Sequence, residues 1–296
     1  MGLAAEAPAG YRVSRMIALD RTIALPWGAG MPALGLGTWR MGERRALRSR
    51  EVAALALGLE LGVSMIDTAE MYGDGAAEEI VGEAIAGRRE RVFIVSKVYP
   101  HNATRRGTIA ACKRSLKRLR SDYLDLYLLH WRGDVPLAET IAGMQALRSE
   151  GAIRAWGVSN FGRADLEELL ALPGGEACAA NQVLYHLGER GIEWDLLPLC
   201  RRRRIAVMAY SPLDQGRLLA SQALKTIAQR LEATPAQVAI AWLLAQQGAA
   251  VIPKAANATH VHDNVSAAKL HLDDAALAAL ARAFPPPARA TSLRML

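Results

Sequence analysis

Two side chains that could exchange a proton stand five residues apart in "SMIDTAEMYGDG", residues 64–75. Asp67 ends a short apolar run, and Tyr72 follows in a glycine-containing loop. Two other apolar runs end in Lys97 ("VFIVSK") and in His130 ("LDLYLLH"). A buried lysine beside a tyrosine favours the phenolate and lowers a pKa that is ordinarily about 10. Asp67 would keep such a lysine charged, so the four residues predict a proton-donating site built around Tyr72.

The elements that must position these residues alternate regularly along the chain. Eight apolar runs of strand length are separated by amphipathic stretches such as "RSREVAALALGLELG", several of which end in glycine. The runs occupy residues 33–38, 64–68, 92–97, 124–130, 153–160, 179–185, 205–212 and 249–254. This pattern predicts a (β/α)8 TIM barrel. A doubly wound sheet is the alternative, and no G-x-G-x-x-G after a strand supports it.

The ends of the chain carry three further expectations. Residues 1–15 predict a disordered lead-in, and residues 16–296 a single barrel domain. "MIALDRTIALPWGAG" predicts a hairpin of two short strands around Asp20 and Arg21 that caps the barrel bottom. After a final helix at "DDAALAALARAF", the segment "PPPARATSLRML" has three prolines that favour an extended path. It predicts little chain over the barrel mouth and therefore an open, shallow pocket.

Polar and aromatic side chains gather where the predicted strands end. Barrel active sites lie at these carboxyl ends, whereas the opposite ends serve stability. Singly, Asp67, Lys97 or His130 could be an ordinary loop acceptor, a solvated cation or a buried histidine. Together around one rim they predict a functional site. The other rim residues are Thr38, Trp39, Tyr99, Trp131, Ser159, Asn160, Gln182, Tyr185, Tyr210, Ser211 and Lys254.

Composition excludes several classes of function. The net charge of +7 could suggest a nucleic-acid partner, but the arginines are scattered, and the run Arg201–Arg204 suits a helix end. Three isolated cysteines predict a reducing, cytoplasmic setting. No stretch reads as a signal peptide or a membrane span. No metal-ligand spacing surrounds His130, and no G-x-S-x-G carries a nucleophilic serine.

The chain resembles the aldo-keto reductases from about Met16 to Pro287. The resemblance rests on "GLGTW", "IDTAEMYG", the Ser96–Lys97 pair, "LDLYLLHW", "GVSNF", "NQVLYH", "AYSPL" and "IPKA" followed by "HV" and "DN", in the family's order and spacing. Among members, it is most similar to compact bacterial reductases of methylglyoxal and other small aldehydes.

This resemblance implies roles for individual residues. Tyr72 would be the general acid, tuned by Lys97 and Asp67, and His130 would orient the carbonyl of the substrate. A substrate wall would comprise Trp39, Tyr99 and Trp131, beside Tyr72 and His130. NADPH would be the cofactor: Ser159, Asn160 and Gln182 would hold its carboxamide, and Tyr210 would stack on its nicotinamide. The remaining cofactor contacts would come from Thr38, Trp39, Asp67, Ser211, Pro212, Leu213, Gly216, Ile252, Pro253, Lys254, Ala255, His260, Asp263 and Asn264.

Two departures and two alternatives accompany the resemblance. Ala255 replaces a hydroxyl that often contacts the 2′-phosphate, and His260 replaces a commoner arginine. The preference for NADPH is therefore expected to be moderate, with NADH tolerated.

We expect a monomer acting on small carbonyls, with no nucleic-acid or membrane partner. The alternatives are a regulatory nucleotide-bound barrel, which the complete set of four residues disfavours, and a barrel hydrolase, which would need paired carboxylates across the rim.

Overall fold

The structure is a computed structural model and describes residues 19–26 and 30–296. The predicted lead-in, residues 1–15, lies outside the described residues.

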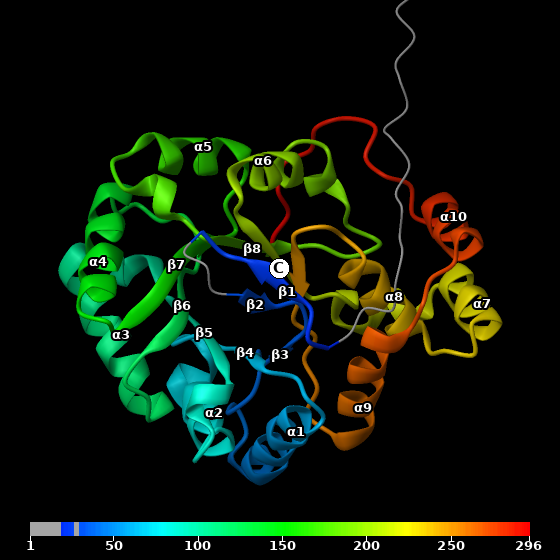
Figure 1. Ribbon diagram of the computed structural model, residues 1–296, viewed down its shortest axis with the longest axis horizontal. Coiled ribbons are helices and arrows are strands. Elements are labelled where there is room, and N and C mark those ends of the chain that lie inside the picture. Colours follow the sequence, from blue (N-terminus) through cyan, green and yellow to red (C-terminus); the bar gives the residue numbers. More distant parts are fainter. Residues whose placement is uncertain (1–18, 27–29) are drawn as a thin grey trace, which may run out of the picture.

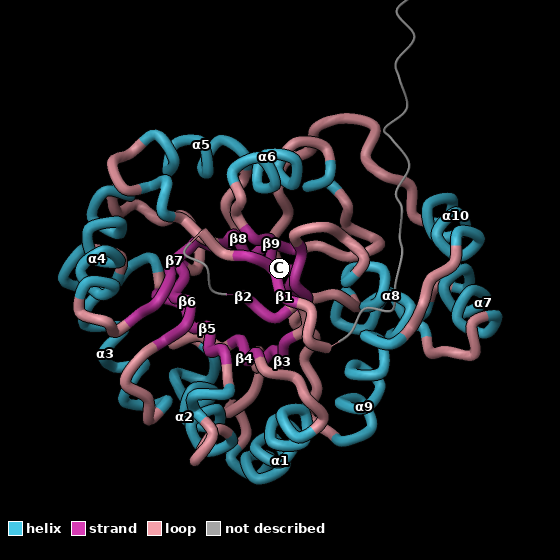
Figure 2. Tube along the Cα trace, in the orientation of Figure 1, coloured by secondary structure: helices cyan, strands magenta, loops and turns pink. Residues whose placement is uncertain are grey.

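Eight parallel strands form the barrel predicted from the alternation of apolar runs (Figure 1, Figure 2). Neighbouring strands in the chain are neighbours in the sheet, from β3 to β10. Parallel bridges from Leu34 to Val251 and from Gly37 to Lys254 join the two edge strands and close the barrel. The strands are β3 (Gly35–Gly37), β4 (Met65–Asp67), β5 (Phe93–Val98), β6 (Leu124–Leu129), β7 (Ile153–Ser159), β8 (Ala180–Leu184), β9 (Ala206–Tyr210) and β10 (Ala249–Val251).

Helices surround the strands, as Figure 2 shows. The helices are α1 (Arg48–Glu60), α2 (Ala76–Ala84), α3 (Arg105–Leu119), α4 (Leu137–Ser149), α5 (Arg163–Ala171), α6 (Leu196–Arg203), α7 (Gln222–Arg230), α8 (Pro235–Leu244), α9 (Ala258–Ser266) and α10 (Asp274–Ala283). The final helix predicted from "DDAALAALARAF" is α10, which packs on α7. Within the described part of the chain, every helix is too short or too polar to cross a bilayer.

The strands are buried because apolar side chains cover both of their faces. All six residues of β6 are buried, and so are five of the six in β5. Such strands lie between a packed barrel interior and a layer of helices. Buried polar side chains in these strands are therefore exceptions that need partners.

The N-terminal hairpin is present, but its strands lie later in the sequence than predicted. β1 (Thr22–Ala24) pairs antiparallel with β2 (Gly30–Pro32). The two strands therefore flank residues 25–29 and not Asp20–Arg21. The Arg21 guanidinium donates to the carbonyls of Leu244 and Gln246, just before β10. These contacts place the hairpin at the amino-terminal end of the barrel, as predicted.

A cluster of charged side chains around Asp125 also lies at the amino-terminal end of the barrel. Asp125, at the start of β6, is 4% exposed and accepts hydrogen bonds from the Ile94 amide (2.9 Å), from Arg89 (2.9 Å) and from Arg154 (3.0 Å). The two guanidinium groups lie over the Tyr123 ring, at 3.8 and 4.1 Å from its centroid. Their cationic charge offsets the desolvation of the carboxylate.

The three cysteines are buried and unpaired. Cys112 lies on α3, Cys178 just before β8 and Cys200 on α6. Burial raises the pKa of each thiol to about 12. All three are therefore protonated at neutral pH.

The Asp125 cluster generates a stability prediction. Asp125→Ala leaves two arginines without their buried partner, and breaking a buried pair of this kind costs about 3–5 kcal/mol. We expect urea denaturation to show a loss of that size in the free energy of unfolding. Arg154→Ala is the matched control, because its side chain is 58% exposed and exposed pairs contribute about 0–1 kcal/mol. Equal losses for the two variants would contradict this interpretation.

Candidate active site

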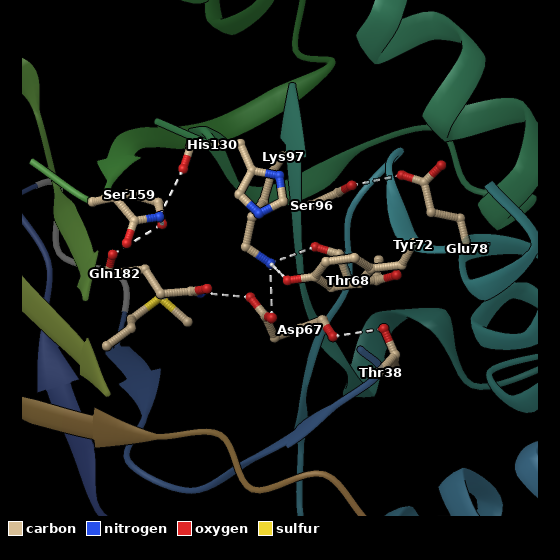
Figure 3. A network of polar contacts seen from close by, with 12 residues as sticks. Thr38, Asp67, Thr68, Tyr72, Glu78, Ser96, Lys97, His130, Ser159 and Gln182 are labelled. Atoms are coloured by element: carbon tan, nitrogen blue, oxygen red, sulfur yellow. Dashed lines mark hydrogen bonds and ion pairs between the residues drawn. The ribbon is translucent and has the colours of Figure 1, made fainter. Parts of the chain in front are cut away.

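Lys97 is the centre of a polar network at the carboxyl ends of the strands. Asp67 lies in register with Val95, so Lys97 stands two residues further along β5 and on the same face. The Lys97 side chain has no solvent exposure. Its Nζ lies 2.8 Å from Asp67 Oδ2, 2.8 Å from the Thr68 carbonyl oxygen and 3.2 Å from Tyr72 Oη (Figure 3). Each of its three donors therefore has an acceptor.

Asp67 is held from the opposite side of the barrel. Its Oδ1 accepts a hydrogen bond from Gln182 Nε2 of β8 at 2.7 Å, while Oδ2 faces Lys97. The Thr38 hydroxyl donates to the Asp67 carbonyl at 2.9 Å. Burial alone would lower the pKa of Lys97, but the Asp67 carboxylate and the Tyr72 oxygen outweigh it and raise that pKa. The network therefore keeps a charged ammonium beside a phenol.

The pKa of Tyr72 differs from the sequence-based expectation. Lys97 does act to lower it, but burial acts more strongly, and the pKa is raised above its ordinary value of 10. The expectation considered the neighbouring cation and left out the desolvation of the phenolate. Tyr72 is consequently a neutral phenol at physiological pH, able to donate a proton.

The His130 imidazole is the fourth member of the group. It is 8% exposed, and its ring centroid lies 5.7 Å from that of Tyr72, edge-on. Burial, aided by the positive charge of Lys97, lowers its pKa well below 6.5, so the ring is neutral at pH 7. Its Nδ1 has no hydrogen-bond partner among the described residues.

Two of the three predicted wall residues lie against His130. Trp131 is 4.9 Å from His130 between ring centroids, and Tyr99 is 5.6 Å from Trp131, edge to face. Trp39 follows β3 instead, is 37% exposed, and has the Arg40 guanidinium 4.4 Å from its ring centroid. The structure therefore brings together the Tyr99 and Trp131 part of the wall.

The residues predicted to hold a carboxamide form a second network. The Tyr210 hydroxyl donates to Asn160 Oδ1 at 2.9 Å, and Asn160 Nδ2 donates to Ser159 Oγ and to the His130 carbonyl, each at 3.1 Å. Asn160 has φ = 60°, a left-handed conformation that asparagine adopts more readily than most residues other than glycine. Gln182, assigned to the same task, donates to Asp67 in this structure.

The other predicted cofactor residues lie on the loops after β9 and β10. Ser211 and Gly216 both have positive φ, and Pro212 and Leu213 lie between them. Ile252, Pro253 and Ala255 are buried, and Lys254 is exposed.

Three predicted cofactor residues stand on α9. His260 N–H donates to Asn257 Oδ1, and the Asp263 carboxylate accepts from Thr234. Asn264 is 3% exposed, and its Nδ2 has no partner among the described residues. A buried amide without a partner is unusual and fits a site that receives a ligand with an acceptor atom there.

The C-terminal segment reaches the barrel mouth beside the ends of β8 and β9, contrary to the expectation of little chain there. Arg294 lies 3.1 Å from Glu189, and Leu293 packs against the core. The backbone of Leu296 forms a hydrogen bond with the Tyr210 hydroxyl, whose pKa burial raises to about 12. We call residues 285–296 the strap. The expectation considered the rigidity of the prolines, but the apolar and cationic residues in "SLRML" find partners beyond them.

The strap also covers a cavity of about 200 Å³ beside the mouth. Its lining comes from the strap, from the start of α5 and from the segment leading into α6, including Gly162, Asp165, Ile192, Leu196, Thr291 and Leu293. None of the residues around Lys97 lines it. The cavity is therefore separate from the polar network.

Comparisons with known proteins agree with this architecture. The model of the Aldo/keto reductase family matches residues 33–284. Methylglyoxal reductase YeaE of Escherichia coli strain K12 is 54% identical over 271 residues, which cover 90% of this chain and 95% of that protein. Glyoxal reductase of Bacillus subtilis is 37% identical over 83% of this chain and 86% of its own length.

A solved structure resembles this chain in both sequence and fold. An aldo/keto reductase from Klebsiella pneumoniae, crystallised with NADP and acetate, superposes with a TM-score of 0.90 at 50% identity. The match covers 93% of this chain and 99% of that one. With a family match across most of its length and relatives this similar, the chain belongs to the aldo/keto reductase family.

Proposed function

We propose that this protein is an NADPH-dependent reductase of small reactive carbonyls such as methylglyoxal. The observation that carries the proposal is the 3.2 Å contact between Lys97 Nζ and Tyr72 Oη, with Asp67 on the same ammonium. It places a neutral phenol and a buried cation at one point of the barrel mouth. The methylglyoxal and glyoxal reductases among the relatives support the class of substrate.

In the proposed mechanism Tyr72 is the general acid. As the carbonyl oxygen gains negative charge, the phenol gives it a proton, and Lys97 stabilises the phenolate that remains. The raised pKa keeps Tyr72 protonated before the step, while Asp67 keeps Lys97 charged. His130, neutral because of its lowered pKa, offers a ring nitrogen to orient the carbonyl without competing as an acid.

The proposed cofactor site runs from Tyr210 to Asn264. When bound, NADPH supplies the reducing equivalent. Tyr210 and Asn160, already hydrogen-bonded to each other, would face its nicotinamide end. The unpartnered Asn264 amide would take an acceptor of the adenine, and the exposed Lys254 would face the 2′-phosphate. The NADP and NADPH complexes of the Klebsiella pneumoniae relatives support this choice of cofactor.

Tyr72→Phe removes the proton and little else. We expect kcat to fall about 10²–10⁴-fold, the range of general-acid effects, while the Kd of NADPH stays within about twofold. Steady-state kinetics and quenching of tryptophan fluorescence would measure the two quantities. The matched control is Tyr123→Phe at the other end of the barrel, which should leave kcat unchanged. A Tyr72→Phe variant that kept more than about a tenth of wild-type kcat would disprove the role.

Lys254→Ala tests the 2′-phosphate contact. A charge-assisted hydrogen bond is worth about 1.5–3 kcal/mol, so the Kd of NADPH should rise about 10- to 100-fold. NADH lacks the phosphate, and its Kd should change little. Lys269→Ala, another exposed lysine, is the control for a general loss of positive charge. Equal weakening of both cofactors by Lys254→Ala would show that Lys254 contacts a part they share.

A substrate panel tests the activity itself. The strap reaches the mouth beside Tyr210 and takes up space on that side of the pocket. We therefore expect the pocket to admit small carbonyls and reject bulky ones. We expect methylglyoxal and substituted benzaldehydes to be reduced with high turnover and weak Michaelis constants, and ketosteroids and simple sugars to be poor substrates. NADPH consumption would report each kcat/KM. A ketosteroid with a higher kcat/KM than methylglyoxal would contradict this expectation.

A further inference from the structure

Glu70 lies in the same loop as Asp67 and Tyr72, but its contacts lead to a different strand. Its side chain is 7% exposed. Oε1 accepts hydrogen bonds from the Tyr99 amide at 2.9 Å and from Asn102 Nδ2 at 3.0 Å. Oε2 lies 3.4 Å from the Arg114 guanidinium. Every one of these partners follows β5.

The two bonds to Oε1 bridge the loops that carry the two halves of the proposed site. One loop, after β4, carries the Tyr72 hydroxyl. The other, after β5, begins at Tyr99, directly beyond the strand of Lys97. A carboxylate that accepts two hydrogen bonds in a buried position resists displacement, because breaking them leaves its charge unsatisfied. The loops are therefore fastened to each other by Glu70 as well as by Lys97.

Glu70 holds in place the part of the wall formed by Tyr99 and Trp131. Its bond is to the backbone of Tyr99, and the Tyr99 ring lies 4.6 Å from His101 and 5.6 Å from Trp131, between centroids. The position of that backbone sets where the ring stands relative to His130, whose centroid is 6.5 Å away. A shift of the loop would move the wall and leave the Lys97 contacts intact.

We propose that Glu70 is a positioning residue for the substrate, acting through Tyr99. It holds the wall at a fixed distance from the Tyr72 hydroxyl, so that a carbonyl compound resting on the wall presents its oxygen to that hydroxyl. This inference rests on the proposed function, because it assumes that a carbonyl compound binds between Tyr72 and Tyr99. The hydrogen-bond partners of the Glu70 carboxylate are Tyr99, Asn102 and Arg114, so Glu70 would act on the substrate only through the loop after β5.

Kinetics of three Glu70 variants test the proposal with a substituted benzaldehyde as substrate. Moving the wall weakens contacts that the ground state and the transition state share, which raises KM and leaves kcat nearly unchanged. We expect Glu70→Ala to raise KM about tenfold and to leave kcat within about threefold. Glu70→Gln should restore most of KM, because its amide oxygen accepts the same bonds. Glu70→Asp, shortened by one methylene, should be intermediate and carries the test if Glu70→Ala does not fold.

A double-mutant cycle with Tyr99 separates positioning from a general structural role. In a Tyr99→Ala background there is no ring left to position, so adding Glu70→Ala should change KM by less than about twofold. The Kd of NADPH should be unchanged throughout. Arg114→Ala is the control, because this arginine is 51% exposed and makes only the longer contact with Glu70; its KM should match that of wild type.

Three results would overturn the inference. They are an undiminished effect of Glu70→Ala in the Tyr99→Ala background, an unchanged KM with only a lower melting temperature, and a Glu70→Gln variant as impaired as Glu70→Ala. A wild-type protein that reduces no carbonyl compound would instead refute the proposed function. The two failures are therefore distinguishable.

Discussion

The structure of the barrel mouth depends on one fully enclosed ammonium group. Lys97 has no contact with solvent, and an ammonium removed from water is tolerated only when its donors are satisfied. The acceptors are a carboxylate, a backbone carbonyl and a phenol. The Tyr72 phenol is one of these three acceptors. The contact that satisfies the Lys97 ammonium therefore also orients the proposed proton donor.

This requirement links parts of the barrel that are distant in the chain. Gln182 reaches Asp67 from β8, and Thr38 fixes the Asp67 carbonyl from the end of β3. The opposite end of the barrel has its own buried charge, Asp125, with its own partners. Each end of the barrel thus balances its charges independently, which separates the residues that stabilise the fold from those that form the site.

The sequence predicted the barrel, and it predicted that Asp67, Tyr72, Lys97 and His130 would meet at one rim, because both follow from local patterns. Apolar runs have strand length wherever they occur, and topology brings their carboxyl ends to one rim. Features that depend on competing or distant interactions were predicted less well. The pKa of Tyr72 is a balance in which burial outweighs Lys97. The hairpin strands lie later in the sequence than predicted, because Asp20 and Arg21 resemble turn residues and yet precede the first strand, which begins at Thr22.

The strap, the direction of Glu70 and the partner of Gln182 could not be predicted from the sequence. The strap depends on Arg294 meeting Glu189, far away in the sequence, and the apolar residues of "SLRML" were its only signal. Nothing in the residues around Glu70 distinguishes it from a solvated loop acid, because its direction follows from loop geometry. The same holds for the Gln182 amide, which was predicted to bind the carboxamide of the cofactor and donates a hydrogen bond to Asp67 in the structure.

The buried thiols have a consequence for a protein that handles reactive aldehydes. Electrophilic carbonyls form adducts with thiolates and uncharged amines, and a thiol with a pKa of about 12 is ionised in only about one molecule in 10⁵ at pH 7. The raised pKa of Lys97 likewise keeps its amine protonated. Neither the cysteines nor the central lysine therefore offers a nucleophile to the compounds that enter the mouth. Adduct formation would therefore be confined to side chains other than these buried groups.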